Sequence, residues 1–274
     1  LEDLPEDAPL ENIKKDEVWF PGLDYLFGFG NLGLSDSVHY EIQIPKKEMM
    51  KFVSENDGSP MSAVAAIMVK ALNKALPQNK LPFRIETNHN YRNKVGCPKT
   101  HHDLLSHVFC FIPYHAQTWP VDKICTVIRG ATHLQIQPEY AYDTLRRFYV
   151  YADGIDRVKG LKEKNKYAKK NSHRVPDVHN SFLINYTGRE DWGGMTDYVE
   201  RAHIITDAHL LFEILDVGDN FCITLMQMNK KKKYLDCFCE VLEDENIPYK
   251  IHGMYKNHLP ISKLANAPII DIEK

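Results

Sequence analysis

A basic excess is missing from this chain: 34 lysine and arginine residues face 37 aspartate and glutamate residues, for a net charge of −3. Proteins that bind nucleic acid through its phosphates need such an excess, so we expect no nucleic acid partner. No apolar run approaches the roughly 20 residues that a membrane-spanning helix requires. The first residues also show no signal-peptide pattern. We therefore expect a cytoplasmic protein with no membrane span.

Cysteine pairs at metal-binding spacing are missing too. The six cysteines are scattered, and several lie in apolar segments such as VFCFI and NFCITL. Cys237 and Cys239 are two positions apart, but on a helix they would point to different faces, and no second Cys or His pair stands at zinc-finger spacing. We expect buried, reduced thiols and no metal site.

The sequence lacks a phosphate-binding glycine loop and a G-x-S-x-G nucleophile motif. The segment FGFGNLG at 27–33 is rich in glycine, but it follows no convincing strand and opens no helix. Residues 1–17 are acidic, contain proline and have no periodicity, which is typical of a linker. Because a linker stands at the first residue with no initiator methionine, we expect the chain to be a fragment.

Hydrophobic periodicity predicts an α/β protein. Val38, Tyr40, Ile42 and Ile44 alternate with polar residues, which predicts a half-buried strand over 37–44. Further strands are expected at 83–90, 106–113, 181–187, 202–206, 209–216 and 220–228, helices at 46–56, 59–76, 121–135, 138–155 and 234–246, and a mobile loop at 161–180. This order implies a mixed β-sheet covered by helices, a two-layer sandwich, in one domain.

A row of polar residues follows the predicted strand at 83–90. The turn ETNHNYRNKVG holds Asn88, His89, Asn90, Tyr91 and Arg92 in succession, and packing alone does not require them. Polar residues at the end of a buried strand are where an α/β protein usually keeps its site. Arg92 could form a bidentate pair with a carboxylate, or it could be a surface arginine at a strand–loop junction.

His101 and His102 are adjacent, and such a pair suits a general base. They lie, however, in the hydrophilic loop PKTHHDLLSH, without a nucleophile motif. Asp103 and His107 could be imagined with them as metal ligands, but neighbouring residues cannot readily share one ion. A loop or helix-cap role is the simpler interpretation.

The third candidate is the segment INYTGREDWGG. Asn185, Tyr186 and Thr187 end an apolar strand, and Gly188 follows them directly. Because the glycines allow close backbone approach, a Thr or Asn here could donate a hydrogen bond to a developing oxyanion. Alternatively, the glycines only make a hairpin turn.

Taken in order, six segments resemble the C-terminal half of the chloramphenicol acetyltransferase-like superfamily. They are SVHYEIQIPKKEMMKFVSENDGSPMSAVAAIMVKAL, RIETNHNYRNKVG, SHVFCFIPY, SFLINYTG, NFCITLMQ and YLDCFCEVLEDENIPY. The superfamily includes the condensation domains of nonribosomal peptide synthetases and the alcohol acetyltransferases, and the latter branch looks closest. Its members have two α/β lobes with a tunnel between them. The resemblance implies that 1–36 is an inter-lobe linker and lead-in, and that 37–274 is the C-terminal lobe.

The family's catalytic histidine belongs to an H-H-x-x-x-D-G motif in the N-terminal lobe. Here His101-His102 continues as DLLSH, with neither the aspartate nor the glycine in place. The pair therefore does not inherit the role of general base, and no catalytic residue is expected in this chain. The resemblance implies that Arg92 buttresses the aspartate of the missing motif. It also implies a substrate tunnel lined by Asn90, Tyr91, Asn185, Tyr186, Thr187 and Gly188.

The chemistry implied is acyl transfer from a coenzyme A thioester or a carrier-protein thioester to an alcohol or amine, without a metal or a tightly bound cofactor. The missing N-terminal lobe would be the main partner, and a homo-oligomer is possible. A second hypothesis is a non-catalytic condensation-like module that binds a carrier protein or a second copy of itself through an apolar face. A third, minor hypothesis makes His101, His102 and Asp103 a hydrolase site.

Overall fold

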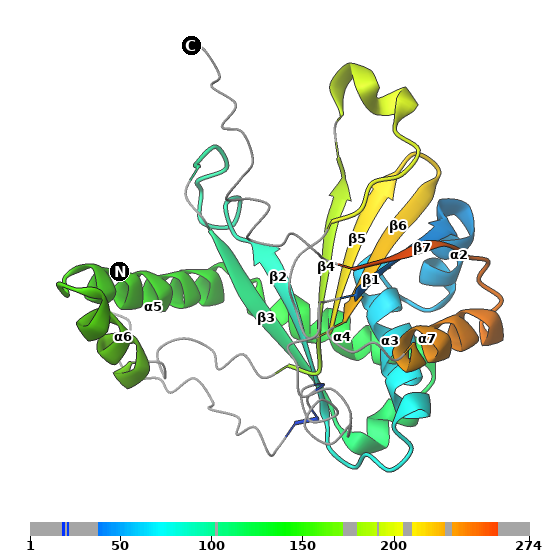
Figure 1. Cartoon of the computed structure of the whole chain (residues 1–274), viewed down its shortest axis with the longest axis horizontal. Coiled ribbons are helices and arrows are strands. Elements are labelled where there is room, and N and C mark those ends of the chain that lie inside the picture. The colour runs from blue at the N-terminus through cyan, green and yellow to red at the C-terminus, as the bar shows by residue number, and fades with distance from the viewer. Residues whose placement is uncertain are drawn as a thin grey trace.

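The computed structural model describes residues 18–19, 21, 38–101, 104–171, 180–190, 192–204, 210–227 and 232–256, and the structural statements below concern these residues. Their strands form one seven-stranded sheet in the order β3-β2-β4-β5-β6-β1-β7 (Figure 1). The strands are β1 (Val38–Pro45), β2 (Phe83–Asn90), β3 (Leu105–Ile112), β4 (Phe182–Arg189), β5 (Leu210–Val217), β6 (Asn220–Gln227) and β7 (Lys250–Lys256).

The sheet is mixed, as predicted. β2 and β3 are antiparallel, as are β5 and β6, whereas β4 runs parallel to both of its neighbours, β2 and β5. β1 is inserted between β6 and β7 and is antiparallel to both. The α/β class and the mixed sheet covered by helices are therefore confirmed.

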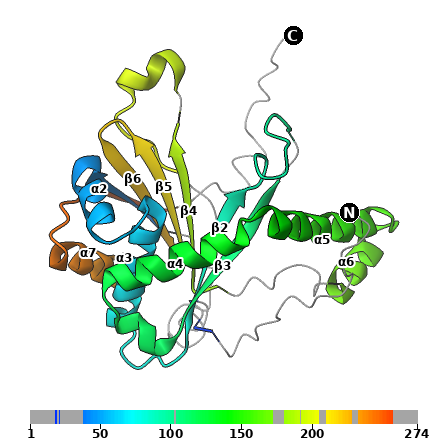
Figure 2. The same ribbon diagram turned by 180° about the vertical axis from the view of Figure 1, so that it is seen from behind.

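Four helices contribute buried side chains to the core on one face of the sheet, which we call the helix face: α2 (Lys46–Glu55), α3 (Pro60–Ala75), α4 (Val121–Gln135) and α7 (Lys233–Asp244). Figure 2 shows α3 and α4 in front of the strands from that side. The core there includes Phe212 of β5, whose ring centroid lies 5.3 Å from that of Phe238 of α7. No described helix is long and apolar enough to cross a bilayer. The other described helices are α5 (Pro138–Asp156) and α6 (Leu161–Lys170), with short 3₁₀ turns η2 (Tyr114–Thr118) and η4 (Gly193–Tyr198).

The sequence predicts where α3 begins. Pro60 stands at the first turn, and Ser59 is the N-cap. The Ser62 N–H donates to Ser59 Oγ at 3.2 Å, and the Ser59 N–H donates to Ser62 Oγ at 2.7 Å. This reciprocal capping satisfies two helix-end donors, so the long apolar helix can start inside the core.

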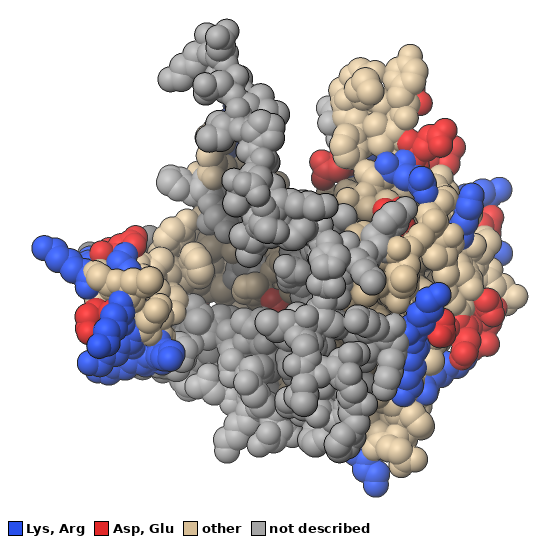
Figure 3. Space-filling view, in the orientation of Figure 1, with Lys and Arg blue, Asp and Glu red and all other residues tan. Residues whose placement is uncertain are grey.

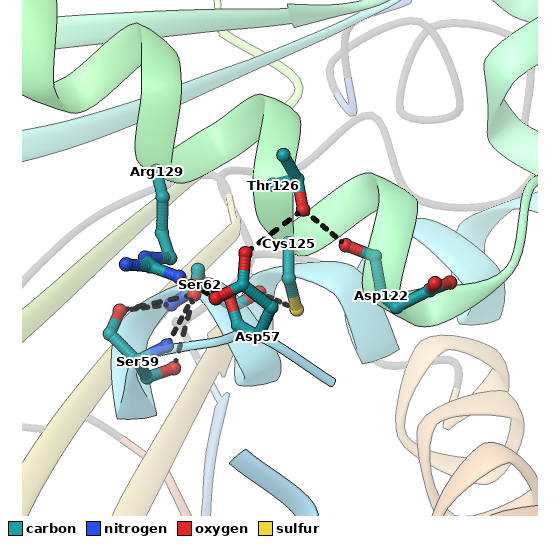
Figure 4. A network of polar contacts seen from close by, with 7 residues as sticks. All are labelled: Asp57, Ser59, Ser62, Asp122, Cys125, Thr126 and Arg129. Atoms are coloured by element: carbon teal, nitrogen blue, oxygen red, sulfur yellow. Dashed lines mark hydrogen bonds and ion pairs between the residues drawn. The ribbon is translucent and has the colours of Figure 1, made fainter. Parts of the chain in front are cut away.

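Polar contacts tie α4 to the turn before α3 (Figure 4). Arg129 Nη1 donates to the Asp57 carbonyl oxygen at 2.5 Å and pairs with the Asp57 carboxylate. The Cys125 thiol donates to the Ser62 carbonyl at 3.6 Å. These contacts hold α4 against the start of α3.

Cysteine thiols are free throughout the described residues. Burial raises the pKa of Cys110 to about 12 and that of Cys125 to about 11. Such thiols stay protonated at neutral pH and are poor nucleophiles. The predicted burial is confirmed for Cys110, Cys125, Cys222 and Cys239, whereas Cys237 is partly buried and Cys97 is exposed.

Trp19 is part of the core although it lies inside the predicted linker. Its ring centroid is 5.7 Å from Phe83 and 6.1 Å from Tyr234, both edge-on. The backbone N–H of Trp19 donates to the Pro82 carbonyl at 3.1 Å, and the backbone carbonyl of Trp19 accepts from Ser181 Oγ at 2.5 Å. Most of 1–36 lies outside the described residues, so the linker assignment stays a prediction.

The predicted loop at 161–180 is wrong for its first half. Residues 161–170 form α6, which packs against α5, and 172–179 lie outside the described residues. Gly154 of α5 makes this packing possible, because a Cβ there would lie 1.9 Å from Tyr167 Oη. The lysines of α6 are also good helix formers, a signal that its low hydrophobicity masked.

Two strand predictions also need correction. Residues 202–204 are not in a strand; instead, Val199, Ala202 and Ile204 pack on side chains of β5 and β6. The remaining predicted residues, 205 and 206, lie outside the described residues. β7 was not predicted, because lysine and a glycine interrupt its apolar pattern. It is an edge strand that pairs only with β1, with a register shift between Glu41 and Ile42.

Candidate functional site

The sheet is weakly joined between β2 and β4, and this seam is the centre of the candidate site. Only two register pairs join the strands, Ile85 with Phe182 and Glu86 with Leu183. Beyond them the strands diverge toward their carboxyl ends, as Figure 1 shows. Diverging parallel strands leave backbone groups without ladder partners, and these groups then need other hydrogen bonds.

Asn185 supplies such a bond at the seam. Its Oδ1 accepts the Asn88 N–H at 3.0 Å, and its Nδ2 donates to Glu213 Oε1 at 2.9 Å. Glu213 is buried, and burial raises the pKa of this carboxyl, whereas the Asn185 hydrogen bond lowers it. One side chain thus connects three strands, β2, β4 and β5, and holds a carboxyl group beside the seam.

The face away from the four helices, which we call the opposite face, carries a polar row at this level. Side chains alternate along a strand, so residues opposite one another across the ladder share a face. Asn88 pairs with His107, Asn185 with Glu213, and Thr224 with both Glu213 and Glu41. The polar row therefore consists of His107, Asn88, Asn185, Glu213, Thr224 and Glu41.

At one end of the polar row, His107 binds a buried carboxylate. His107 Nδ1 lies 2.5 Å from Glu86 Oε1, and Glu86 is only 1% exposed. Asn180 Nδ2 donates to the other Glu86 oxygen. The His107 side chain itself is 42% exposed. A carboxylate that fixes one ring nitrogen orients the other, as in imidazole general bases.

Arg84 lies beside this pair on the same face of β2. Its guanidinium carbon is 3.8 Å from the ring centroid of Phe109 and 5.9 Å from that of Phe111. Stacking on aromatic rings stabilises a cation in a partly dehydrated place. The strands β2 and β3 thus hold a buried positive group beside the polar row.

At the other end, a histidine bridges Thr224 and Glu41. His203 Nδ1 lies 3.2 Å from Thr224 Oγ1, and its Nε2 lies 3.6 Å from Glu41 Oε2. Burial lowers the pKa of His203, while Glu41 acts in the opposite direction. Burial likewise lowers the pKa of His39 and of His252, whose Nε2 is 2.7 Å from Gln43 Oε1.

The predicted site residues at and after the end of β2 make contacts within their own loop and with the helices beside it. Arg92 Nε donates to the Thr100 carbonyl at 3.2 Å, and the Arg92 N–H donates to Asn90 Oδ1 at 3.0 Å. Tyr91 is 1% exposed, packs with Leu104 in a small cluster beneath α5, and donates to the Gln135 carbonyl at 2.9 Å. His101 is exposed, and His102 and Asp103 lie outside the described residues.

The predicted residues of β4 lie beyond the seam. Tyr186 is 37% exposed, with its ring centroid 6.1 Å from that of Phe221, and Thr187 Oγ1 donates to the Ile214 carbonyl at 3.3 Å. A register shift falls between Tyr186 and Gly188, and Gly188 has φ +83°, which favours glycine. The hairpin alternative is wrong, because β4 and β5 are parallel.

The structure brings Asn185 to the end of β2, and the sequence-based prediction missed most of the polar row. The missed residues share one signal, a charged or polar residue inside an apolar strand. Glu213 in LLFEILDV and Glu41 in VHYEIQIP are examples. Buried charges are rare unless they are paired, so each such position marked a polar neighbour elsewhere in the chain.

A metal centre and a second groove are the other candidate sites within the described residues. No group of three or more His, Cys, Asp or Glu side chains there is placed to hold a metal ion. A groove of about 440 Å³ beside the contacts of Figure 4 is lined by Ser59, Asp57, Arg129 and His133, among others. Because Asp57 and Arg129 pair with each other, the charge in this groove is already balanced.

No protein-family model matches the chain, and no curated protein matches it in sequence. Solved structures do match. TRI101 of F. graminearum, complexed with coenzyme A and deoxynivalenol, has a TM-score of 0.56 at 12% identity over 92% of this chain and 56% of its own. TRI3, a trichothecene 15-O-acetyltransferase of Fusarium sporotrichioides, has a TM-score of 0.54 at 13% identity over 77% and 47%.

A third structure, TRI101 of F. sporotrichioides complexed with coenzyme A and T-2, has a TM-score of 0.52 at 11% identity, covering 90% of this chain and 56% of its own. Likeness at this identity concerns the fold. The chain thus has the chloramphenicol acetyltransferase-like fold, which confirms the resemblance at that level. It spans about half the length of these structures.

Proposed function

We propose that this chain is the C-terminal lobe of a two-lobe acyltransferase. In this proposal an acyl group passes from a thioester donor to an alcohol or amine acceptor. The observation that carries it is the polar row on the opposite face, at the level where β2 and β4 part. A sheet face that buries carboxyl, hydroxyl and amide groups suits a wall facing substrate better than a surface facing water.

In this proposal the general base lies in an N-terminal lobe. The pair His101-His102 lacks the family motif, and His101 is exposed at the surface. The base would deprotonate the acceptor, whose oxygen or nitrogen then attacks the thioester carbonyl and expels the thiol. The polar row would contact the reacting groups from the other side of the tunnel and would contribute hydrogen bonds.

The tunnel residues proposed are Asn90, Tyr91 and 185–188. Asn185 already fixes the position of the seam, so it has the best-supported place. The ring of Tyr91 is buried beneath α5, so in this proposal Tyr91 lines the tunnel with its backbone atoms. Arg92 is proposed to buttress the aspartate of the motif in the other lobe. Its hydrogen bond to the Thr100 carbonyl fixes the loop from which its side chain would reach that aspartate.

Coenzyme A is the first thioester to test, because the TRI101 structures are complexed with it. A carrier-protein thioester is the second donor proposed. The cytoplasm is the compartment proposed. Neither a metal nor a tightly bound cofactor takes part in this scheme, because a thioester already carries an activated acyl group.

The experiment compares the full-length protein with residues 1–274. Purified protein is mixed with acetyl coenzyme A and a panel of alcohols and amines, and thiol release is followed. We expect turnover from the full-length protein only, and a loss of about 100- to 10,000-fold when the motif histidine of the other lobe becomes alanine. Turnover by residues 1–274 alone would overturn the proposal.

Arg92→Ala supplies a second test, with Arg157→Ala, an exposed residue directly after α5, as the matched control. Arg92→Ala should lower turnover and thermal stability in the two-lobe protein and leave residues 1–274 nearly unchanged. Equal thermal losses in the two proteins would refute the inter-lobe role. If the full-length protein binds a carrier protein but transfers no acyl group, the non-catalytic module is the correct alternative.

A further inference from the structure

The arm made of α5 and α6 has a charge unlike that of the rest of the chain. Residues 138–170 contain nine lysine and arginine residues and five aspartate and glutamate residues, a charge of +4 in a protein whose net charge is −3. The excess lies in residues 157–170, which contain seven of the basic residues and one acidic residue, Glu163. Both ribbon views show the arm extending away from the sheet (Figures 1 and 2). Lysine and arginine side chains gather at its end, at the left of Figure 3.

Three lysines of α6 lie along one exposed line. Lys162, Lys166 and Lys170 are spaced by four residues, which places them on one side of a helix, and all three are exposed. Like charges at this spacing destabilise a helix by about 0.2–0.5 kcal/mol per pair. The inward side of α6 is used differently, since Lys164 Nζ lies 3.5 Å from Asp156 Oδ1 of α5.

The arm is nonetheless a packed structure. The absence of a side chain at Gly154 lets Tyr167 approach α5, so α6 has a defined side against α5 and a defined side in solvent. Apolar side chains are exposed on the same arm: Leu161 is 76% exposed and Phe148 is 50% exposed. Phe148 is three residues after the buried Leu145, so it lies on the same apolar side of α5, beyond the part of the helix that packs on the rest of the protein.

We propose that the α5–α6 arm docks on an anionic phospholipid bilayer. Clusters of four to eight lysine or arginine residues on a helix bind acidic headgroups, and each such residue raises the affinity by up to about tenfold. Exposed Leu161 and Phe148 would enter the headgroup region. A bilayer fits better than an acidic protein, because protein interfaces favour arginine and disfavour lysine, and α6 has five lysines and no arginine.

The test measures how the purified chain partitions onto vesicles of phosphatidylcholine, with and without about 30% phosphatidylserine, by co-sedimentation at low salt. We expect clear binding only with phosphatidylserine and its loss in about 0.5 M salt, where exposed charges are screened. The triple substitution Lys162→Gln, Lys166→Gln, Lys170→Gln should weaken binding about 100-fold. The corresponding three Lys→Arg changes should keep it.

A matched control removes the same charge elsewhere: Lys47→Gln, Lys80→Gln and Lys123→Gln, all exposed and outside α5 and α6. This control should bind like the wild type, and circular dichroism should show both triple variants folded. Equal binding to both vesicle types would overturn the proposal, as would equal losses in the two triple variants. Binding of the arm to polyglutamate but not to vesicles would also overturn it, in favour of an acidic protein partner.

Discussion

Asn185 gives the most direct test of the seam between β2 and β4. Replacing it with alanine removes the acceptor of the Asn88 N–H and the donor to Glu213 at once. A buried group left without its partner costs about 1–3 kcal/mol, and more when it is charged. We therefore expect Asn185→Ala to lower the free energy of unfolding by about 2–4 kcal/mol. Urea denaturation followed by circular dichroism measures this loss, with the slope checked for two-state behaviour.

Asn185→Asp should have a loss that depends on pH. A carboxylate at this position would face Glu213 at hydrogen-bond distance, and two charges about 4 Å apart repel by at most about 4 kcal/mol at an effective dielectric of 20. Repulsion raises the pKa of the pair in the folded state, so the penalty is largest at high pH and falls as the pair gains a proton. The deficit relative to wild type should therefore shrink between pH 8 and pH 5.

The double variant Asn185→Asp, Glu213→Gln is the decisive control. It exchanges donor and acceptor, because the new glutamine amide can donate to the new carboxylate. We expect most of the stability at pH 8 to return. Asn90→Ala, which removes an exposed acceptor for the Arg92 N–H, should cost less than about 1 kcal/mol. If the two single changes at 185 and 213 add without coupling in a double-mutant cycle, the bridge across the seam is refuted.

Two further predictions follow from the core and from the histidines. Trp19→Ala should destabilise the chain by about 3–5 kcal/mol in a thermal or urea melt, because a large buried ring is lost; an unchanged midpoint would mean that the segment does not dock in solution. Burial lowers the pKa of His39, His203 and His252, so their contribution to stability is present above pH 6.5 and lost as the pH falls through the lower folded values. Melting temperatures from pH 7.5 to 5 should therefore decline, and less so for His203→Gln; identical pH profiles would count against this role.

Local patterns predicted most of the fold. Alternation of apolar side chains placed β1, and the Ser59-Pro60 start placed α3, because both signals depend only on neighbouring residues. The same dependence on neighbouring residues explains why the sequence-based prediction missed β7 and α6. β7 is an edge strand that needs only one partner and little apolar surface, and α6 depends on a glycine in another helix that admits Tyr167.

The candidate site was predictable only in part. Asn185 and the residues after β2 were found because each polar residue stood at the end of an apolar strand. Glu213, Thr224 and Glu41 stand in the middle of three different strands, and only the register of the sheet aligns them. Such alignment depends on strand order, which sequence periodicity does not contain.

The seam also has a consequence for the order of folding. Asn88 and Asn185 are 97 residues apart in sequence, and only two register pairs join their strands. Closing so long a loop costs entropy before its few contacts form, whereas the β2–β3 and β5–β6 pairs close short loops and gain eight register pairs each. We expect both hairpins to form early and the seam to close late. The polar row would thus be completed last, after the apolar core has formed.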